Sequence, residues 1–339
     1  MGYKITVDGS DNEFSCDDRD TLLRAALRQG VTIPYECNSG GCGSCKFELV
    51  SGEVEDLWPD APALTPRDKR KGKKLACQCR PVSDAVIKVR LEDHAAPEIR
   101  PNRFKVRYLG RRDLTADMAE FRFQSDAPAR FLPGQFAMLS LPGIQGDRAY
   151  SMSNIPNEAG YWQFIIKRMP EGNASTWLFS ELKEGDVLEL DAPYGQAYLR
   201  PEIERDVVCI AGGSGLSPVM SIVRAATGDS RFADRKIYLF YGGRTPGDIC
   251  TPELLSEIEP LDAQLICETA ISDADAATRE SWEGPCCFVH ELVEQTLGDR
   301  MPEFEYYFCG PAPMTEAVQR MLMIEHKVPF EQIHFDRFF

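Results

Sequence analysis

Three cysteines, Cys37, Cys42 and Cys45, stand five and then three positions apart and constrain this chain more than any other feature. The loop that carries them reads Cys-Asn-Ser-Gly-Gly-Cys-Gly-Ser-Cys, so glycines stand between the sulfurs. A loop that wraps a compact inorganic group needs positive φ at several residues, which glycine adopts without steric cost. Its backbone amides can donate hydrogen bonds to anionic sulfurs. The pattern therefore predicts a metal–sulfur site that lacks its fourth ligand locally.

The C-x4-C-x2-C spacing is the one with which plant-type ferredoxins hold a 2Fe–2S cluster. A fourth cysteine must come from further along the chain, and Cys77 and Cys79 are the candidates. Zinc is the competing interpretation, but zinc sites usually show two C-x2-C pairs, or cysteine together with histidine. Here the second pair is C-x-C and no histidine lies nearby, so we expect the cluster rather than zinc or idle thiols.

The 339 residues predict two or three domains rather than one. In the first part of the chain the element order is that of a β-grasp ferredoxin. A helix begins at Asp20 or Thr21 and ends at Gly30, and the Pro-rich, charged residues 52–74 predict loop and turn. The expected strands are 3–7, 13–16, 46–50 and 86–91, and a Pro-bracketed linker follows them at 94–101.

From about residue 104 to 199 many short strands are separated by turn signals, which predicts an antiparallel barrel. The expected strands are 104–109, 120–124, 135–141, 148–153, 161–167 and 187–190, with one helix at 175–182. After residue 204 strands alternate with helices, which predicts a doubly wound parallel sheet. Its expected strands are 207–211, 236–241, 264–269 and 304–309, with one helix at 219–226 and another that the segment 309–314 opens and that runs to residue 326.

Two segments of the barrel carry candidate chemistry. Arg148-Ala-Tyr150-Ser151-Met-Ser153 offers a guanidinium that can grip a pyrophosphate and a flat ring that can stack on another. Its serine hydroxyls can reach ring heteroatoms. Gly172-Asn-Ala-Ser175 stands at a helix start, where free amides favour phosphate. Singly, surface, core and N-cap roles explain these residues; together, after a ferredoxin-like domain, they indicate a bound cofactor.

A glycine turn follows the first strand of the parallel sheet. It reads Gly212-Gly213-Ser-Gly215-Leu-Ser-Pro218, between a continuous apolar run and a helix. A strand, a glycine turn and a helix start form a phosphate cradle. The motif ends in proline rather than the usual glycine, and proline suits the first turn of a helix. A lone glycine motif is weak evidence, but its place between strand and helix strengthens it.

The formal charge of −15 argues against nucleic acid as a partner. The N-terminus has no basic flank and no apolar stretch of a signal peptide, and no apolar run is long enough for a membrane span. We therefore expect a cytoplasmic chain with its twelve cysteines reduced. The one basic cluster, residues 67–74, is either a solvated loop or a docking patch for an acidic protein.

The motif series R-x-Y-S-x-S, G-x-x-S, GGSG-x-x-P and C-G-P-x-P-M resembles that of ferredoxin–NADP reductase-like flavoproteins. With the N-terminal ferredoxin spacing, the whole chain resembles the reductase component of a bacterial multicomponent monooxygenase, most of all the toluene monooxygenase reductases. The segments 34–43, 57–62 and 333–339 carry that closer resemblance. It implies FAD, NADH as electron donor, and a 2Fe–2S cluster with Cys77 as the fourth ligand.

The same resemblance implies a ferredoxin domain at 1–95, a linker at 96–102, an FAD-binding barrel at 103–202 and an NAD(H)-binding domain at 203–339. It implies a monomer whose acceptor is a Rieske-type ferredoxin, a diiron hydroxylase, or both in turn. Two alternatives stay open. One is the reductase of a ring-hydroxylating dioxygenase or of a phenol or methane hydroxylase. The other is a non-catalytic redox sensor or binding module.

Roles at the flavin site are also implied by the resemblance. Arg148 should hold the FAD pyrophosphate, and Tyr150 should pack on the isoalloxazine with Ser151 near its reactive edge. Neighbouring and phosphate-binding positions are expected at Ser153, Lys167, Gly172 and Ser175.

At the nicotinamide site, Gly212, Gly213 and Gly215 should let NADH lie against the backbone, with Gly310 among the binding residues. Cys309 should lie near the nicotinamide, although a buried strand end is the plainer interpretation. Asp336 and Phe338 resemble the acid-x-aromatic ending whose ring covers the flavin, and Phe339 leaves that register open. Arg244 could hold a 2′-phosphate and favour NADPH, whereas the resemblance favours NADH.

Overall fold

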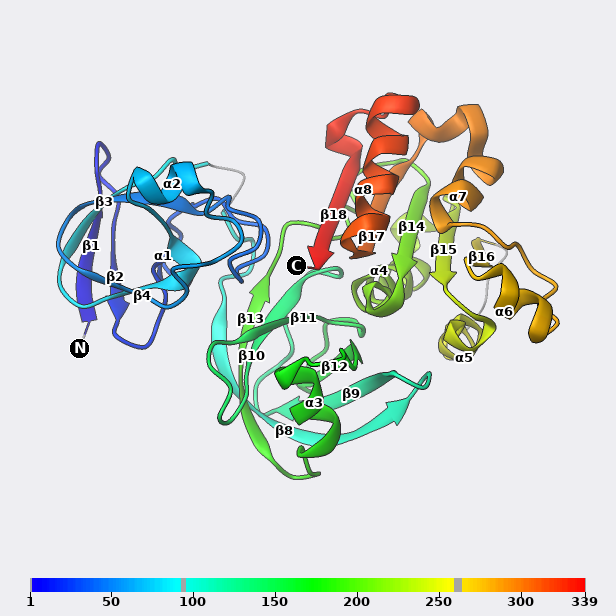
Figure 1. The fold of residues 1–339 in the computed structure, drawn as a ribbon, viewed down its shortest axis with the longest axis horizontal. Coiled ribbons are helices and arrows are strands. Elements are labelled where there is room, and N and C mark those ends of the chain that lie inside the picture. Colours follow the sequence, from blue (N-terminus) through cyan, green and yellow to red (C-terminus); the bar gives the residue numbers. More distant parts are fainter. Residues whose placement is uncertain (1, 93–95, 259–263, 339) are drawn as a thin grey trace. The chain divides into compact units, whose positions relative to one another are not determined.

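The computed structural model describes residues 2–92, 96–258 and 264–338 (Figure 1). The chain divides into two compact units, and each combines segments that are distant in sequence. The first unit contains Met1–Phe104, Ala137–Ala149 and Glu189–Gln196, and the second contains Lys105–Phe136, Tyr150–Leu188 and Ala197–Phe339. Every helix in the described ranges is too short or too polar to span a lipid bilayer.

The N-terminal part of the first unit is a mixed five-stranded sheet of order β2-β1-β7-β3-β5 (Figure 1). Strand β1 pairs antiparallel with β2 and parallel with β7, which is the expected β-grasp arrangement. Its strands are β1 (Gly2–Val7), β2 (Glu13–Asp17), β3 (Lys46–Ser51), β5 (Lys73–Leu75) and β7 (Ala85–Lys88).

Helix α1 (Leu22–Arg28) begins where the sequence predicts, because the Thr21 side chain accepts a hydrogen bond from the Arg24 amide. The prediction of loop and turn throughout 52–74 was wrong. Strand β4 (Val54–Asp56) pairs with β6 (Cys79–Pro81), and helix α2 (Pro66–Arg70) starts at a capping box formed by Thr65 and Asp68. Such short elements depend on local hydrogen bonds rather than on an apolar pattern.

The middle of the chain forms a six-stranded sheet of order β11-β10-β13-β8-β9-β12. An antiparallel bridge between Met152 and Phe164 joins its two edge strands, so the sheet closes as the predicted barrel. The strands are β8 (Asn102–Asp113), β9 (Met118–Ser125), β10 (Phe136–Ser140), β11 (Arg148–Ser151), β12 (Tyr161–Lys167) and β13 (Val187–Tyr194), with one helix, α3 (Asn173–Ser180).

The C-terminal part of the second unit is a parallel five-stranded sheet of order β16-β15-β14-β17-β18, which confirms the doubly wound fold. Every residue of β14 is buried, as its continuous apolar run predicts for a central strand. The strands are β14 (Val207–Gly212), β15 (Ile237–Gly243), β16 (Leu265–Ile271), β17 (Glu305–Pro311) and β18 (Ile333–Phe338).

Helices cover both faces of this parallel sheet. Alternate β14 residues pack with α4 and α5 on one face and with α7 and α8 on the other. The helices are α4 (Leu216–Thr227), α5 (Thr251–Leu255), α6 (Ala274–Arg279), α7 (Val289–Leu297) and α8 (Ala312–Arg320), the last continued by a π-helical turn at Met321–Glu325. The sequence predicted α4 and α8 but not the short α5 and α6, nor α7 or strand β18.

Candidate functional site

The cysteine loop brings two of its predicted ligand sulfurs and two backbone amides together. The Cys37 and Cys42 sulfurs lie 3.4 Å apart, and the amides of Ser39 and Cys42 donate to Cys37 Sγ at 3.4 and 3.3 Å. The Cys42 thiol and these amides lower the pKa of Cys37, against the opposing effect of burial. Donors that favour the thiolate suit a metal-bound sulfur.

The four predicted ligands form two pairs. Cys37 contacts Cys42, and the side chain of Cys77 hydrogen-bonds with that of Cys45. No three His, Cys, Asp or Glu side chains among the described residues surround one point as ligands of a single metal ion do. Two contacting pairs of thiols fit the two irons of a binuclear cluster.

Cys79, the other candidate for the fourth ligand, has a different environment. Its thiol is fully buried, and burial together with nearby Asp56 raises its pKa to about 12. The three loop cysteines contribute to the raised pKa of Cys77, and Cys45 also hydrogen-bonds with it, whereas burial and Asp56 dominate the raised pKa of Cys79. All twelve cysteines of the chain are free thiols, so no disulfide competes for these sulfurs.

Arg148, at the start of β11, has a half-buried guanidinium that donates to its own loop. Its NH1 atom donates to the carbonyls of Gln145, Gly146 and Asp147 at 3.2, 3.1 and 3.4 Å. These are neutral acceptors, so the side chain carries no ion pair among the described residues. A guanidinium whose charge is not neutralised by a described carboxylate fits a phosphate-binding arginine.

The remaining predicted flavin residues lie in the second unit. Tyr150 is half-buried, and Ser151 and Ser153 are buried at and just beyond the end of β11. Ser175 is buried in the first turn of α3, where its hydroxyl accepts from the Met169 amide at 3.0 Å and donates to the Gly172 carbonyl at 3.2 Å. Its hydroxyl therefore fixes the turn whose amides would face a phosphate.

One polar stripe of helix α4 holds the segment that follows β11. Ser217 Oγ accepts from the Ile165 amide at 2.9 Å and donates to the Ser151 carbonyl at 2.6 Å. Ser221 Oγ donates to the Asn154 carbonyl at 2.7 Å, and Arg224 donates to the Ser153 carbonyl, also at 2.7 Å. The helix that starts at the glycine turn thus positions the backbone beside Ser151.

A buried carboxylate reinforces this contact. Glu120 is fully buried in β9 and forms ion pairs with Arg122 at 3.0 Å, Arg112 at 3.4 Å and Arg224 at 3.7 Å. The Ser153 hydroxyl also donates to Glu120 at 3.5 Å. Buried charge is tolerated when several partners satisfy it, so Glu120 fixes the strand and helix α4 together.

The sequence interpretation missed this set of residues. Ser217, Ser221 and Arg224 recur at spacings of four and three, which places them on one face of a helix. In a helix that is otherwise mostly apolar and buried, such a stripe indicates polar partners on a neighbouring element. The spacing of these three polar residues could be seen in the sequence. The backbone carbonyls to which they donate could not.

The glycines of the turn lie against other backbone. A Cβ added at Gly215 would lie 2.0 Å from the Cys309 carbonyl oxygen, and one at Gly310 would lie 3.1 Å from the Gly212 carbonyl. Gly213 adopts φ of 55° and has open space around it, with only Lys167 Cδ at 3.9 Å. Of these glycines, Gly213 best matches the expected open approach to a ligand.

A small pocket in the second unit brings the two nucleotide motifs together. It lies against helix α4 and strands β17 and β18, and its lining includes Pro218, Cys309 and Asp336. Burial, with a further contribution from Asp336, raises the pKa of the Cys309 thiol, so the thiol stays protonated near neutrality. Such a cysteine can contact a ring but is not a nucleophile.

The remaining predicted residues have few contacts in the described part of the chain. Phe338 belongs to β18, and its backbone pairs with Pro311 of β17. The side chain of Phe338 and the whole of Phe339 lie outside the described part of the chain. Arg244 is exposed just after β15, and its amide donates to Asp248 at 3.0 Å. Lys167 forms an ion pair with Asp117 at 3.0 Å.

Family models match all three parts of the chain. Residues 5–82 match a "2Fe-2S iron-sulfur cluster binding domain", 106–198 an "Oxidoreductase FAD-binding domain" and 209–320 an "Oxidoreductase NAD-binding domain". These modules, with the paired thiols and the glycine turn, define an iron–sulfur flavoprotein oxidoreductase that uses FAD and a nicotinamide nucleotide.

Relatives of full length narrow this class. The ferredoxin–NAD(P)(+) reductase CarAd of Metapseudomonas resinovorans is 43% identical over 99% of this chain and 100% of its own. The ferredoxin–NAD(+) reductase component of the alkene monooxygenase system of Xanthobacter autotrophicus is 38% identical over 96% and 97%. A solved ferredoxin reductase in carbazole 1,9a-dioxygenase superposes with a TM-score of 0.91 at 40% identity, covering 100% of this chain and 99% of that one. The chain belongs to the ferredoxin–NAD(P) reductase components that deliver electrons to multicomponent oxygenases.

Proposed function

We propose that this chain oxidises NADH and passes single electrons to a Rieske-type ferredoxin or a diiron hydroxylase of an aromatic, toluene-type monooxygenase. The observation that carries the proposal is the presence in one chain of paired cluster thiols and of a glycine turn next to Cys309. FAD, when bound, accepts a hydride and releases its electrons one at a time. The residues of the chain bind and orient the cofactor and the nucleotide and exclude water from them.

The proposed cluster ligands are Cys37, Cys42, Cys45 and Cys77, supported by their two contacting pairs. The proposed flavin residues are Arg148, Tyr150, Ser151, Ser153, Lys167, Gly172, Ser175 and Phe338. The proposed nicotinamide residues are Gly212, Gly213, Gly215, Gly310, Cys309 and Asp336, of which Cys309 and Asp336 share a pocket.

We further propose a cytoplasmic monomer with domains at 1–95, 103–202 and 203–339. The three family-model matches fall inside those limits, which supports them. Size-exclusion chromatography with light scattering tests the monomer, and a mass near 76 kDa, twice the 38.0 kDa of the chain, would contradict it.

Replacing one cluster ligand tests the electron route. Cys42→Ser should abolish reduction of a one-electron protein acceptor, because the outlet for electrons is lost. Reduction of ferricyanide by NADH should largely survive, because it needs only the flavin and nicotinamide sites. Cys79→Ser is the matched control and should keep both activities. Equal loss of both activities in Cys42→Ser would contradict the two-stage route.

A ring-hydroxylating dioxygenase is the second candidate for the oxygenase. The solved relative at 40% identity belongs to a carbazole dioxygenase system, and this observation favours it. Mixing the purified reductase with the ferredoxins and terminal oxygenases of each class separates the two. The partner that accepts electrons with the highest kcat/KM identifies the system, and failure with every ferredoxin and hydroxylase would contradict both candidates.

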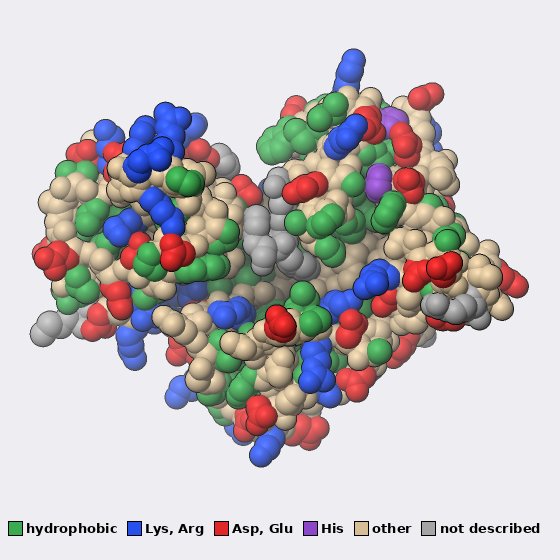
Figure 2. Space-filling model, viewed as in Figure 1, with side chains coloured by type: hydrophobic (Ala, Val, Ile, Leu, Met, Phe, Trp, Pro, Cys, Tyr) green, Lys and Arg blue, Asp and Glu red, His purple; other side chains and the backbone are tan. Residues whose placement is uncertain are grey.

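The electron acceptor is proposed to dock on the face formed by Trp58 and helix α2. The Trp58 side chain is 44% exposed and packs on the cluster loop, since a Cβ added at Gly40 would lie 3.1 Å from its ring. Arg67, Arg70 and Lys71 are exposed there, and none forms an ion pair with a described residue. Figure 2 shows Lys and Arg side chains gathered over α2. On a chain of net charge −15, this local positive surface suits an acidic protein.

Charge reversal tests the docking face. The triple variant R67E/R70E/K71E should reduce an acidic ferredoxin about tenfold more slowly at low salt, with a smaller difference at high salt. Its reduction of ferricyanide should not fall. The control R130E/K183E/K327E reverses three cations of the second unit and should leave the ferredoxin rate unchanged. Equal effects of the two triple variants would refute this face.

A further inference from the structure

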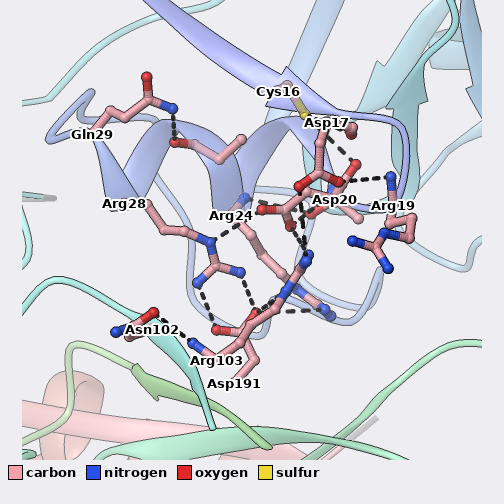
Figure 3. A network of polar contacts seen from close by, with 12 residues as sticks. Cys16, Asp17, Arg19, Asp20, Arg24, Arg28, Gln29, Asn102, Arg103 and Asp191 are labelled. Carbon is pink, nitrogen blue, oxygen red and sulfur yellow. Dashed lines mark hydrogen bonds and ion pairs between the residues drawn. The ribbon is translucent and has the colours of Figure 1, made fainter. Parts of the chain in front are cut away.

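Six charged side chains of the first unit form a connected group, called here the Arg–Asp network, and Figure 3 labels all of them except Asp147. It contains three arginines and three aspartates, and Arg103 also lies 3.9 Å from Asp17 and 3.9 Å from Glu189. Asp147, Asp191 and Arg103 belong to barrel segments, and the other three residues belong to the N-terminal ferredoxin-like part of the chain. The members are Asp20, Arg24, Arg28, Arg103, Asp147 and Asp191.

Arg28 and Arg103 build one side of the network. Arg28 grips Asp191 with both terminal nitrogens, at 2.7 and 2.5 Å, and its Nε lies 3.1 Å from Asp20. Arg103 lies 3.0 Å from Asp20, and the Tyr194 hydroxyl donates to Asp191 at 2.9 Å. A bidentate pair fixes orientation as well as distance, so this side anchors α1 to β13.

Arg24 makes different contacts, although it lies only one helical turn away. Its NH1 atom bonds Asp147, whose other oxygen accepts from the Ser140 hydroxyl at 2.6 Å. Its Nε donates to the Asn38 side-chain oxygen at 3.5 Å. The Arg24 side chain is 9% exposed, and Asn38 is buried at φ of 51°.

The two partners of Arg24 are neighbours of two functional residues. Asn38 directly follows the cluster cysteine Cys37, and Asp147 directly precedes Arg148, the proposed pyrophosphate ligand. One guanidinium therefore spans the loop that holds a cluster ligand and the loop that holds the flavin phosphate. Only a branched, planar cation can donate in both directions at once.

We propose that Arg24 is a positioning residue that holds the cluster loop and the Arg148 loop at a fixed separation and orientation. This inference rests on the proposed function, because it assigns Cys37 to the cluster and Arg148 to FAD. Electron transfer slows steeply as the separation of flavin and cluster grows, so a less firmly held pair of loops reduces the transfer rate. A misplaced Arg148 also weakens flavin binding.

Arg24→Lys is the main test, because lysine keeps a cation beside Asp147 but loses the second donor direction. FAD affinity is measured by flavin fluorescence on protein stripped of flavin, and electron passage from flavin to cluster by stopped-flow absorbance. We expect an FAD Kd about tenfold higher and transfer about tenfold slower, one lost charge-assisted hydrogen bond being of that order. The neutral double variant R24M/D147N, which leaves no unpaired buried charge, should behave alike.

Arg28→Lys is the matched control, since it alters the same helix and network but touches neither Asn38 nor Asp147. It should leave the FAD Kd and the transfer rate within about twofold of the unmodified protein. Unchanged values in Arg24→Lys, or equal losses in Arg28→Lys, would overturn the proposal. A failure of the proposed function appears elsewhere, as an unmodified protein that lacks the cluster or does not bind FAD.

Discussion

Loss of the Ser217 hydroxyl should separate positioning of the flavin segment from general packing of helix α4. Ser217 is 2% exposed and makes two hydrogen bonds, one from the Ile165 amide and one to the Ser151 carbonyl. Ser217→Ala removes both bonds and leaves the Ile165 amide and the Ser151 carbonyl without this partner. Each buried group left without a partner costs about 1–3 kcal/mol.

The expected loss of unfolding free energy is therefore about 3 kcal/mol, in the lower half of the summed range because small shifts of the segment recover part of it. Ser221→Ala is the matched control. Ser221 is equally buried on the same face of α4, but it makes only one of these bonds, to the Asn154 carbonyl. It should lose about half as much, roughly 1–2 kcal/mol.

Urea unfolding followed by tryptophan fluorescence measures both losses, since Trp162 is fully buried in the barrel. Stopped-flow reduction of the flavin by NADH gives the functional measurement. Ser217→Ala should slow that reduction about tenfold, because the Ser151 backbone moves, and Ser221→Ala should slow it much less. If the two variants were equally stable and equally fast, the account of the α4 stripe would be refuted.

Two further predictions concern single backbone and charge positions. Gly215→Ala should lower the free energy of unfolding by more than about 3 kcal/mol and abolish NADH binding in titrations, because its Cβ would lie 2.0 Å from the Cys309 carbonyl. Gly213→Ala has open space around it but positive φ, so it should lower the free energy of unfolding by only about 1 kcal/mol. Burial would raise the pKa of Asp147, but Arg24 and Ser140 hold it below its usual value. The ionised Asp147 carboxylate therefore stabilises the fold fully above the unfolded pKa of the carboxyl, near 4, and this stabilisation is lost as the pH falls through the lower folded pKa. In urea titrations, Asp147→Asn should therefore lose less stability than the unmodified protein between about pH 5 and pH 3.

Long patterned elements could be predicted from the sequence, and short ones could not. The apolar run of β14 and the helix after its glycine turn were evident because burial of a whole strand dictates its composition. Strands β4 and β5 have three residues each, too few to show a period. The tail was interpreted as a motif rather than a strand, because β18 forms only by pairing with β17, whose position the sequence does not reveal.

The candidate site shows the same division. The cysteine spacing predicted the loop, and Gly40 and Gly43 adopt positive φ there, together with Asn38, which the pattern did not single out. The glycine turn was expected to admit a ligand, yet Gly215 is small because the Cys309 backbone lies against it. A sequence shows that a close approach is needed but not which group approaches.

The proposed flavin motif on β11 is held in place by residues that lie outside the motif. Just before the strand, Asp147 is bonded by Arg24, and at its end the Ser151 carbonyl is bonded by Ser217. The motif side chain of Arg148 forms no ion pair with a described residue, while the backbone at each end of β11 is held by hydrogen bonds from side chains outside the motif. Changing a motif residue should alter what the site binds, whereas changing Arg24 or Ser217 should shift an intact motif. The chemistry and the geometry of this site are thus set by different parts of the sequence.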